Sequence, residues 1–321
     1  MRIRKMRGLF KLELAATFTL ALVFGVIAGI LSIILWLSDY TGVQGITLVL
    51  ALSIFMILIQ WYFSPALIKM FMRLREIGPT EYPWIHEMVE ELAEKARIPK
   101  PKLYIVNNPT PNAFAFGRTQ RSAGIGIHTG LLDVLDRKEI EAVLAHEIGH
   151  IKHRDMIVMT IASILPLLLY YLFIIFAPRR RDERGVPIWV FFGAMFARFL
   201  GTLLVMWLSR VREYFADEFS AYITRKPDNL INALAKISYG IRTRGARVSD
   251  ESSMMRAFYI SDPESNENLG AISRASSMSA SELERAMERE RGMGFLEIFM
   301  THPLTTKRII NLKKIKKELE S

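Results

Sequence analysis

The segment HEIGH carries two histidines, His146 and His150, four positions apart, with Glu147 directly after the first. On a helix, side chains four positions apart lie one turn above each other, so both imidazoles project from one face at a distance that a single metal ion can bridge. Glu147 points to the side of this pair, where a carboxylate can act as the general base of a hydrolase without binding the ion itself. This spacing predicts a catalytic site with one Zn²⁺ per chain.

A catalytic zinc ion takes three protein ligands and leaves a fourth position for water, so HEIGH leaves one ligand to be found. His153 lies on nearly the same helix face, but seven residues of helix rise about 10 Å, which is too far for three imidazoles to reach one ion. Asp155 lies at a similar offset and His128 lies in a predicted strand, and both stay open as candidates. Glu213 is a fourth candidate, and whether it lies near the two histidines depends on how the chain crosses the membrane.

Four apolar runs give the chain the character of a membrane protein. Hydrophobic residues make up 51% of its 321 positions, and the mean hydropathy is +0.21. Each run is long enough to span a bilayer as a helix, which takes about 20 apolar residues. The runs cover residues 14–37, 43–63, 156–177 and 186–208, and Arg198 interrupts the last one. We expect a mainly α-helical, multi-pass membrane protein with about four transmembrane helices.

Basic residues around the first two runs predict the orientation in the membrane. The chain begins with MRIRKMRGLFK, and the apolar run behind it is too long for the core of a cleaved signal peptide. The connection LSDYTGVQG has no lysine or arginine, whereas Lys69, Arg73 and Arg75 follow the second run. Because positive flanks stay in the cytoplasm, these runs form a hairpin that returns to the cytoplasmic side. Such flanks beside anionic headgroups account for the net charge of +10, so no nucleic-acid partner is expected.

The connection between the third and fourth runs, PRRRDERG, opposes a full crossing, because the positive-inside rule would keep its arginines in the cytoplasm. Either both runs span the membrane against this bias, or they form a hairpin that does not cross fully, with Pro166 at a kink. Their full length favours spanning. Arg198 would then face protein, water or an acidic partner, in a functional or a structural role.

Glu213 lies in RVREYFADEFSAY, on a predicted helix that emerges from the fourth run. This helix returns to the membrane face that carries HEIGH, so the topology brings Glu213 near the predicted zinc site. Asp217, one helical turn later, is placed to hydrogen-bond a ligand imidazole and fix its tautomer. The alternative for this pair is a solvated acidic face on an interfacial helix.

The polar parts of the chain predict helices and a small β-sheet. An amphipathic helix is expected within residues 79–102, a strand at KLYIVNN, and a hairpin or two edge strands in NAFAFGRTQRSAGIGIHTG. Asp136 caps the helix that contains HEIGH, and that helix leads almost without a break into the third run. Residues 228–241 predict a further helix, and the polar stretch 243–294 predicts a mobile insert.

These elements divide the chain into four predicted parts. They are an N-terminal transmembrane hairpin (1–75), a cytoplasmic protease part with HEIGH (76–155), a second transmembrane hairpin (156–208), and a C-terminal protease part with the third zinc ligand and the insert (209–321).

HEIGH, then REYFAD after two apolar segments, then THPLTTKRI near the end, together resemble the HtpX-type membrane metalloproteases, which are related to the CAAX prenyl protease and the Oma-type proteases. The resemblance covers nearly the whole chain and implies a gluzincin site. In such a site the zinc ligands would be His146, His150 and Glu213. Glu147 would activate water, and Asp217 would support a ligand.

The same resemblance gives roles to residues that the sequence alone would leave unremarked. His302 and Arg308 match family positions that face the metal and stabilise the oxyanion or hold the wall of the active site. Asn112, Ala113 and Phe114 match the NAFA segment, which forms an edge strand that pairs with the substrate backbone in the family.

The sequence thus predicts a membrane-embedded zinc endopeptidase of the cell membrane, with its active site on the cytoplasmic side. Its partners would be protein or peptide substrates and the lipid bilayer, and the resemblance suggests quality control of membrane or misfolded proteins. One alternative is a prenyl-protein processing protease, although four runs are few for it. Another is a scaffold or holdase with a structural metal site, which would need a fourth protein ligand. Because the chain has no cysteine, this ligand would have to be His153, Asp155 or His302. No feature predicts an oligomeric state.

Overall fold

The structure is a computed structural model that describes residues 43–176, 187–240, 288, 290, 294 and 296–320. The first apolar run, the connection PRRRDERG and nearly all of the predicted mobile insert lie outside the described residues. The described chain forms two compact units. The helical unit comprises residues 43–60, 163–176 and 187–202, and the globular unit comprises 61–162 and the described residues from 203 onward.

Long apolar helices supply the candidate membrane spans. They are α2 (Val43–Phe71), α6 (Asp155–Ala162), α7 (Leu165–Phe176) and α8 (Ile188–Thr224). Within the described residues, two stretches are long and apolar enough to cross a membrane, Asp155–Phe176 and Ile188–Thr224. A third is added if the two halves of α2, bent by 44°, count as one span. The described residues therefore contain two to three candidate spans. The first of the four predicted runs lies outside these residues, so a total of about four stays a prediction.

The helical unit is held together by close contact between α7 and α8. A β-carbon at Gly193 would lie 2.3 Å from the Phe173 ring, and one at Gly201 would lie 2.7 Å from the Pro166 α-carbon. Only residues without a side chain allow the helices to approach this closely. Pro166 is the second residue of α7, a position where proline is tolerated. A turn at residues 163–164 separates α7 from α6.

The globular unit contains a mixed four-stranded sheet with the order β1-β2-β4-β3. Its strands are β1 (Arg75–Glu76), β2 (Lys102–Val106), β3 (Ala113–Phe116) and β4 (Gly124–His128). β1 pairs antiparallel with β2, β2 pairs parallel with β4, and β3 pairs antiparallel with β4. KLYIVNN thus forms a strand as predicted, and NAFAF and GIGIH form a hairpin whose second strand is internal. β3 is an edge strand of the sheet.

Alternating side chains direct the two faces of the sheet to different cores. Leu103, Ile105, Ile125 and Ile127 join the main core, whereas a second, aromatic cluster on the other face contains Tyr104, Val106, Phe114 and Phe116. Gly126 makes room for this cluster, because a β-carbon there would lie 2.6 Å from the Phe114 ring. The period-two pattern therefore fixes the register of β3.

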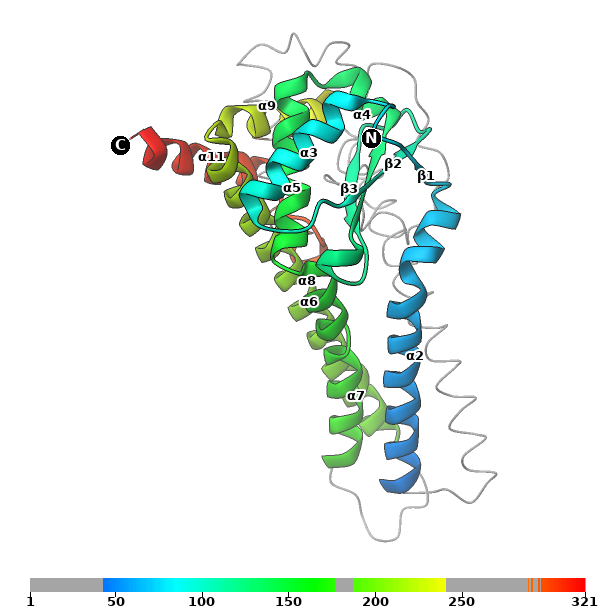
Figure 1. The fold of residues 1–321 in the computed structure, drawn as a ribbon. Coiled ribbons are helices and arrows are strands. Elements are labelled where there is room, and N and C mark those ends of the chain that lie inside the picture. Colours follow the sequence, from blue (N-terminus) through cyan, green and yellow to red (C-terminus); the bar gives the residue numbers. More distant parts are fainter. Residues whose placement is uncertain are drawn as a thin grey trace. The chain divides into compact units, whose positions relative to one another are not determined.

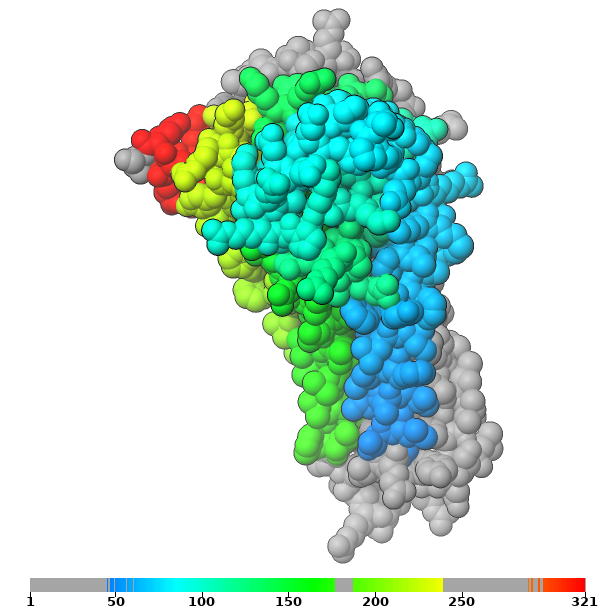
Figure 2. Space-filling view, in the orientation of Figure 1, coloured from blue at the N-terminus to red at the C-terminus, as the bar shows by residue number. Residues whose placement is uncertain are grey.

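Helices surround the main core of the globular unit (Figure 1). They are α3 (Pro83–Ala96), α4 (Thr129–Val134), α5 (Arg137–Lys152), α9 (Pro227–Gly240) and α11 (Thr305–Glu320), with short 3-10 turns at Gln120–Ser122 and Leu296–Phe299. α5 packs on α3, α9 and β3, and α9 packs on α11. In Figure 2, α3 lies at the surface turned to the viewer, and α9 and α11 lie side by side at one edge.

Asp136 caps α5 as the sequence predicts, and its carboxylate accepts hydrogen bonds from the backbone amides of Lys138 and Glu139. This helix leads into the third run with a short break at residues 153–154. α5 ends at Lys152, and Arg154 adopts a left-handed φ of 59° before α6 starts at Asp155. The left-handed residue turns the chain sharply beside the end of HEIGH.

Candidate metal centre

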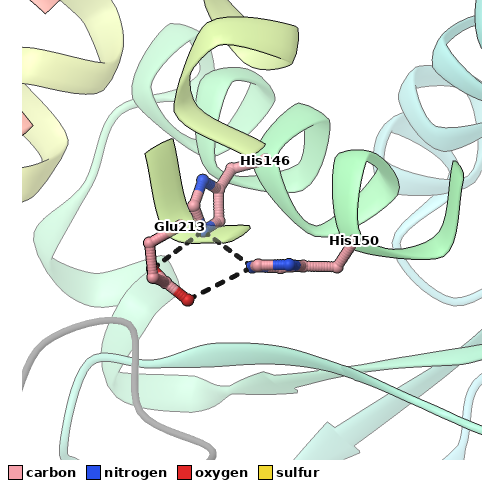
Figure 3. Close-up of side chains that lie close together, drawn as sticks. All are labelled: His146, His150 and Glu213. Carbon is pink, nitrogen blue, oxygen red and sulfur yellow. Dashed lines mark hydrogen bonds and ion pairs between the residues drawn. The ribbon is translucent and has the colours of Figure 1, made fainter. Parts of the chain in front are cut away.

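α5 presents the two histidines of HEIGH on one face, as their spacing predicts. The Nε2 atoms of His146 and His150 lie 3.1 Å apart, and the rings are nearly perpendicular, at 88° (Figure 3). His146 is 2% exposed, so its environment is protein rather than water.

Glu213 of α8 completes a group of three potential ligands. Its Oε2 atom lies 3.6 Å from Nε2 of His146, and its Oε1 atom lies 3.5 Å from Nε2 of His150. Tetrahedral ligands on zinc, with bonds of about 2.0–2.1 Å, lie about 3.3 Å from one another. The spacing of the two nitrogens and the carboxylate therefore fits a cation of this size, and in the described residues these three side chains form the group that could hold a metal.

Close packing of α5 on α8 brings these ligands together. A β-carbon at Gly149 would lie 3.2 Å from the Ala216 α-carbon, so the two backbones touch between the histidines and the carboxylate. One turn further along α8, the Ser220 hydroxyl donates a 2.7 Å hydrogen bond to the carbonyl of Ala142. Small and hydroxyl side chains thus set the distance between the helices.

Asp217 lies behind His146. The Asp217 Oδ1 atom is 3.0 Å from Nδ1 of His146, although the angle is not that of a well-aligned hydrogen bond. Arg308 binds the same carboxylate with two hydrogen bonds, of 2.8 and 2.6 Å. Burial alone would lower the pKa of His146, but Asp217 and Glu213 outweigh it and raise the pKa to about 9.

Asp155, an open candidate for the third ligand, lies behind His150 instead. Its Oδ2 atom is 2.6 Å from Nδ1 of His150, and it also forms an ion pair with Arg212. Burial, together with the neighbouring His146, lowers the pKa of His150, so this imidazole is neutral near pH 7.

The two remaining candidate histidines lie in other surroundings. His153 caps the end of α5 and lies edge-on to Phe215 and Phe219. His128 is fully buried at the end of β4, and its Nδ1 atom lies 2.9 Å from the carbonyl oxygen of Thr110. Neither belongs to the group of three ligands among the described residues.

Glu213 also contacts residues near the end of the chain. Nη1 of Arg308 lies 3.1 Å from its Oε2 atom, and Nδ1 of His302 lies 3.3 Å from its Oε1 atom. Glu213 lies beyond the apolar part of α8, in the globular unit. Burial would raise the pKa of Glu213, but the charges of His302 and Arg308 hold it well below its usual range.

Two glutamates hold the start of α11, which carries Arg308, and sequence reasoning missed both. The Glu290 carboxylate accepts hydrogen bonds of 2.7 Å from the backbone amides of Thr305 and Thr306. Glu297 accepts one from the amide of Leu304 and pairs with Lys307. Acidic residues favour helix N-termini, but only the fold shows which helix each of them meets.

Glu147 lies beside the three ligands and against the sheet edge. Its Oε2 atom accepts a 2.7 Å hydrogen bond from the backbone amide of Ala115 in β3. Burial raises the pKa of this carboxyl group, so it holds a proton more readily than an exposed glutamate does. Ala115 is a contact that sequence reasoning missed, because its backbone and not its side chain takes part.

The edge strand presents its main-chain groups alternately to β4 and away from the sheet. The carbonyl of Asn112 accepts a hydrogen bond from the amide of His128, so the hydrogen-bonded positions are Asn112 and, two residues on, Phe114. Ala113 and Ala115 therefore direct their amides and carbonyls away from β4. Phe114 packs its ring into the aromatic cluster, and Asn112 is fully buried.

Known proteins resemble this chain over most of its length. The family model of peptidase family M48 matches residues 79–316. The protease HtpX homolog of Methanothermobacter thermautotrophicus is 40% identical over 235 residues, which cover 73% of this chain and 89% of that relative. The protease HtpX homolog of Pyrococcus abyssi is 35% identical over 285 residues, which cover 87% and 89%.

A solved structure shares the fold. Ste24p of S. mikatae aligns with a TM-score of 0.53 over 95% of this chain at 17% sequence identity, and the match covers 66% of Ste24p. At this identity the likeness extends to the fold alone. The family match and the identities to the HtpX homologs show that the chain belongs to peptidase family M48, among the HtpX-type proteases.

Proposed function

We propose that this chain is a zinc-dependent endopeptidase of the cell membrane, which cleaves membrane or misfolded proteins on the cytoplasmic side and acts in protein quality control. The observation that carries the proposal is the meeting of His146, His150 and Glu213 beside the buried carboxylate of Glu147. Three ligands and an adjacent base are the parts that a hydrolytic zinc site requires.

A bound zinc ion would supply a Lewis acid that polarises a peptide carbonyl and makes water easier to deprotonate. His146, His150 and Glu213 would hold it. Glu147 would take the proton of the attacking water and pass it to the leaving amine, as a general base and then a general acid. The hydrogen bond from the Ala115 amide supports this role, because it fixes the carboxylate in place.

His302 and Arg308 would act on opposite sides of Glu213. Nδ1 of His302 lies 3.3 Å from Glu213, and among the described residues neither ring nitrogen of His302 has a hydrogen-bond partner, so one of them could donate a hydrogen bond to the oxyanion. Arg308 is 1% exposed and binds Asp217 and Glu213. These contacts favour the second of its two expected roles, which is to hold the wall of the site.

The substrate backbone would pair with the free edge of β3, next to Glu147. The outward amide and carbonyl of Ala113 and the outward carbonyl of Ala115 support this, because an extended peptide adds to a sheet through such groups, whereas the Ala115 amide is bound to Glu147. Asn112 and Phe114 would support the strand from the sheet side.

The alternatives have less support. A scaffold with a closed structural site would need four protein ligands, whereas the group in the described residues has three. Prenyl-protein processing is disfavoured, because identities of 40% and 35% connect the chain to HtpX homologs and only fold-level likeness connects it to Ste24p.

Proteolysis of an unfolded protein tests the proposal. Detergent-purified protein is incubated with casein, with and without a chelator, and its metal content is measured. About one zinc per chain and cleavage that the chelator abolishes are expected, and a His146→Ala variant serves as the inactive control. A zinc-loaded protein without chelator-sensitive cleavage would favour the scaffold.

A further inference from the structure

Both imidazoles of the candidate metal centre turn Nδ1 toward an aspartate, and each aspartate is bound by an arginine. His146 faces Asp217, which is bound by Arg308. His150 faces Asp155, which is bound by Arg212. From the sequence we expected roles for Asp217 and Arg308 beside His146. No such supporting role was assigned to Asp155 and Arg212 beside His150.

The turn after α5 places Asp155 behind His150. Arg154 is left-handed, and directly after it the first residue of α6, Asp155, lies beside His150 of α5. Arg212 fixes the turn from α8, since its Nη2 atom donates a 3.0 Å hydrogen bond to the carbonyl of His153. Asp155 is 7% exposed, so its carboxylate is withheld from water and kept on these partners.

We propose that Asp155, held by Arg212, is a positioning residue that orients His150 for metal binding. The inference rests on the proposed function. Nδ1–H of His150 donates to Asp155, which leaves the lone pair of Nε2 directed at Glu213 and His146. A carboxylate on the far nitrogen fixes the tautomer and ring rotation of a ligand histidine and increases its basicity.

Arg212 supplies the counter-charge that makes this carboxylate tolerable in the interior. Without a partner, a buried carboxylate would be costly. The planar guanidinium reaches the Asp155 carboxylate and the His153 carbonyl together. Arg212 also precedes Glu213 in the chain, so one stretch of α8 provides a ligand and braces the opposite histidine.

Zinc affinity of variants tests the proposal directly. The dissociation constant for zinc is measured by competition with a chromophoric chelator in wild type, Asp155→Asn and Arg212→Lys. Asp155→Asn should weaken zinc binding by about 10–100-fold, the usual loss when a partner of a ligand histidine is removed. Arg212→Lys keeps the positive charge but loses the planar guanidinium that reaches both Asp155 and the His153 carbonyl. It should weaken zinc binding less than Asp155→Asn does. Asp228→Asn, an acidic residue in the first turn of α9 that pairs with Lys316, is the matched control and should bind zinc like wild type.

A purely structural role is distinguished by spectroscopy and by coupling. The visible spectrum of the Co²⁺-substituted protein should change in Asp155→Asn, because the orientation of His150 alters the ligand field, and it should not change in Asp228→Asn. Arg212→Lys should add little to the loss of affinity when Asp155 is already Asn, since the arginine acts through the aspartate. The thermal midpoint of the metal-free proteins shows whether each variant is folded.

The outcomes separate this inference from the proposed function. Suppose that Asp155→Asn and Arg212→Lys fold and keep the zinc affinity and the cobalt spectrum of the wild type, while His146→Ala loses zinc. This result would overturn the role of Asp155 but would not contradict the proposed protease function. Should Asp155→Asn fail to fold, Arg212→Lys decides by the same criterion. A wild-type protein that binds no zinc would overturn both.

Discussion

Gly149 of α5 meets Ala216 of α8 so closely that a β-carbon on the glycine would lie 3.2 Å from the Ala216 α-carbon. Gly149 lies between His146 and His150, and Ala216 lies between Glu213 and Asp217. The contact therefore sets the distance between the two helices that supply the ligands.

Replacing Gly149 with valine should force α5 and α8 apart. Overpacking of this kind typically costs about 1–3 kcal/mol, and the displaced Glu213 should bind zinc more weakly. Thermal unfolding of the metal-free protein and chelator competition report the two effects. Gly78→Val is the control, because a β-carbon at Gly78 has no atom within 4 Å. Equal zinc affinity in the two variants would show that the contact does not set the site.

Glu147→Gln should separate catalysis from metal binding. The change removes the proton acceptor and leaves His146, His150 and Glu213 in place, so zinc should stay near one equivalent while peptide cleavage falls by at least about 100-fold. Zinc content and cleavage rate are measured on the same sample, with Glu141→Gln on the same helix as the control. Full activity of Glu147→Gln would refute the mechanism.

Glu213→Gln should lower zinc retention as well as activity, because a neutral amide replaces an anionic ligand. The measurement is zinc per protein after dialysis against a mild chelator. Glu218→Gln changes an exposed glutamate of the same helix and should retain the metal. A Glu213 variant that keeps both zinc and activity would move attention to His302 as a ligand.

Zinc binding should release about one proton near pH 7.5. With its pKa raised to about 9, His146 is protonated at this pH in the metal-free protein, and it must become neutral to bind metal. His150 is already neutral because its pKa is lowered. Zinc affinity should therefore rise with pH until about pH 9 and level off there.

Calorimetry in buffers of different ionisation enthalpy measures this proton release. Asp217→Asn should reduce it, because the aspartate helps to raise the pKa of His146. Zinc affinity that stays constant between pH 7.0 and 8.5 would contradict the prediction.

Arg308→Met should destabilise the metal-free protein, since it leaves the buried carboxylates of Asp217 and Glu213 without their cation. Removing one partner of a buried ion pair typically costs about 3–5 kcal/mol. Arg75→Met, which breaks an exposed pair with Glu81, is the control and should leave the stability nearly unchanged, because solvent screens such a pair. A variant with unchanged unfolding but reduced cleavage would instead support the oxyanion role for Arg308.

The sequence predicts the features that are local or periodic. The cap at Asp136, the strand at KLYIVNN and the HEIGH face each depend on neighbours within a few positions. Glu213 was named on the basis of the topology and the family resemblance, and the structure brings it to the two histidines.

Contacts made through the backbone or across a turn were beyond sequence reasoning. Ala115 meets Glu147 through an amide that any residue but proline would offer. Asp155 stayed open as a ligand in the sequence analysis, at a similar offset along the helix to His153. The left-handed Arg154, which no sequence rule required, carries it to the far side of the imidazole instead.

The position of β3 at the edge of the sheet would have a consequence for which proteins are cut, if substrates pair with it as proposed. In a folded protein, nearly all main-chain amides and carbonyls are already hydrogen-bonded within helices and sheets, so they cannot bond to the outward main-chain groups of Ala113. A segment can align there only when several consecutive residues have lost their internal partners. An enzyme that binds its substrates through this edge would respond to the loss of structure in a client, whichever side chains the client carries.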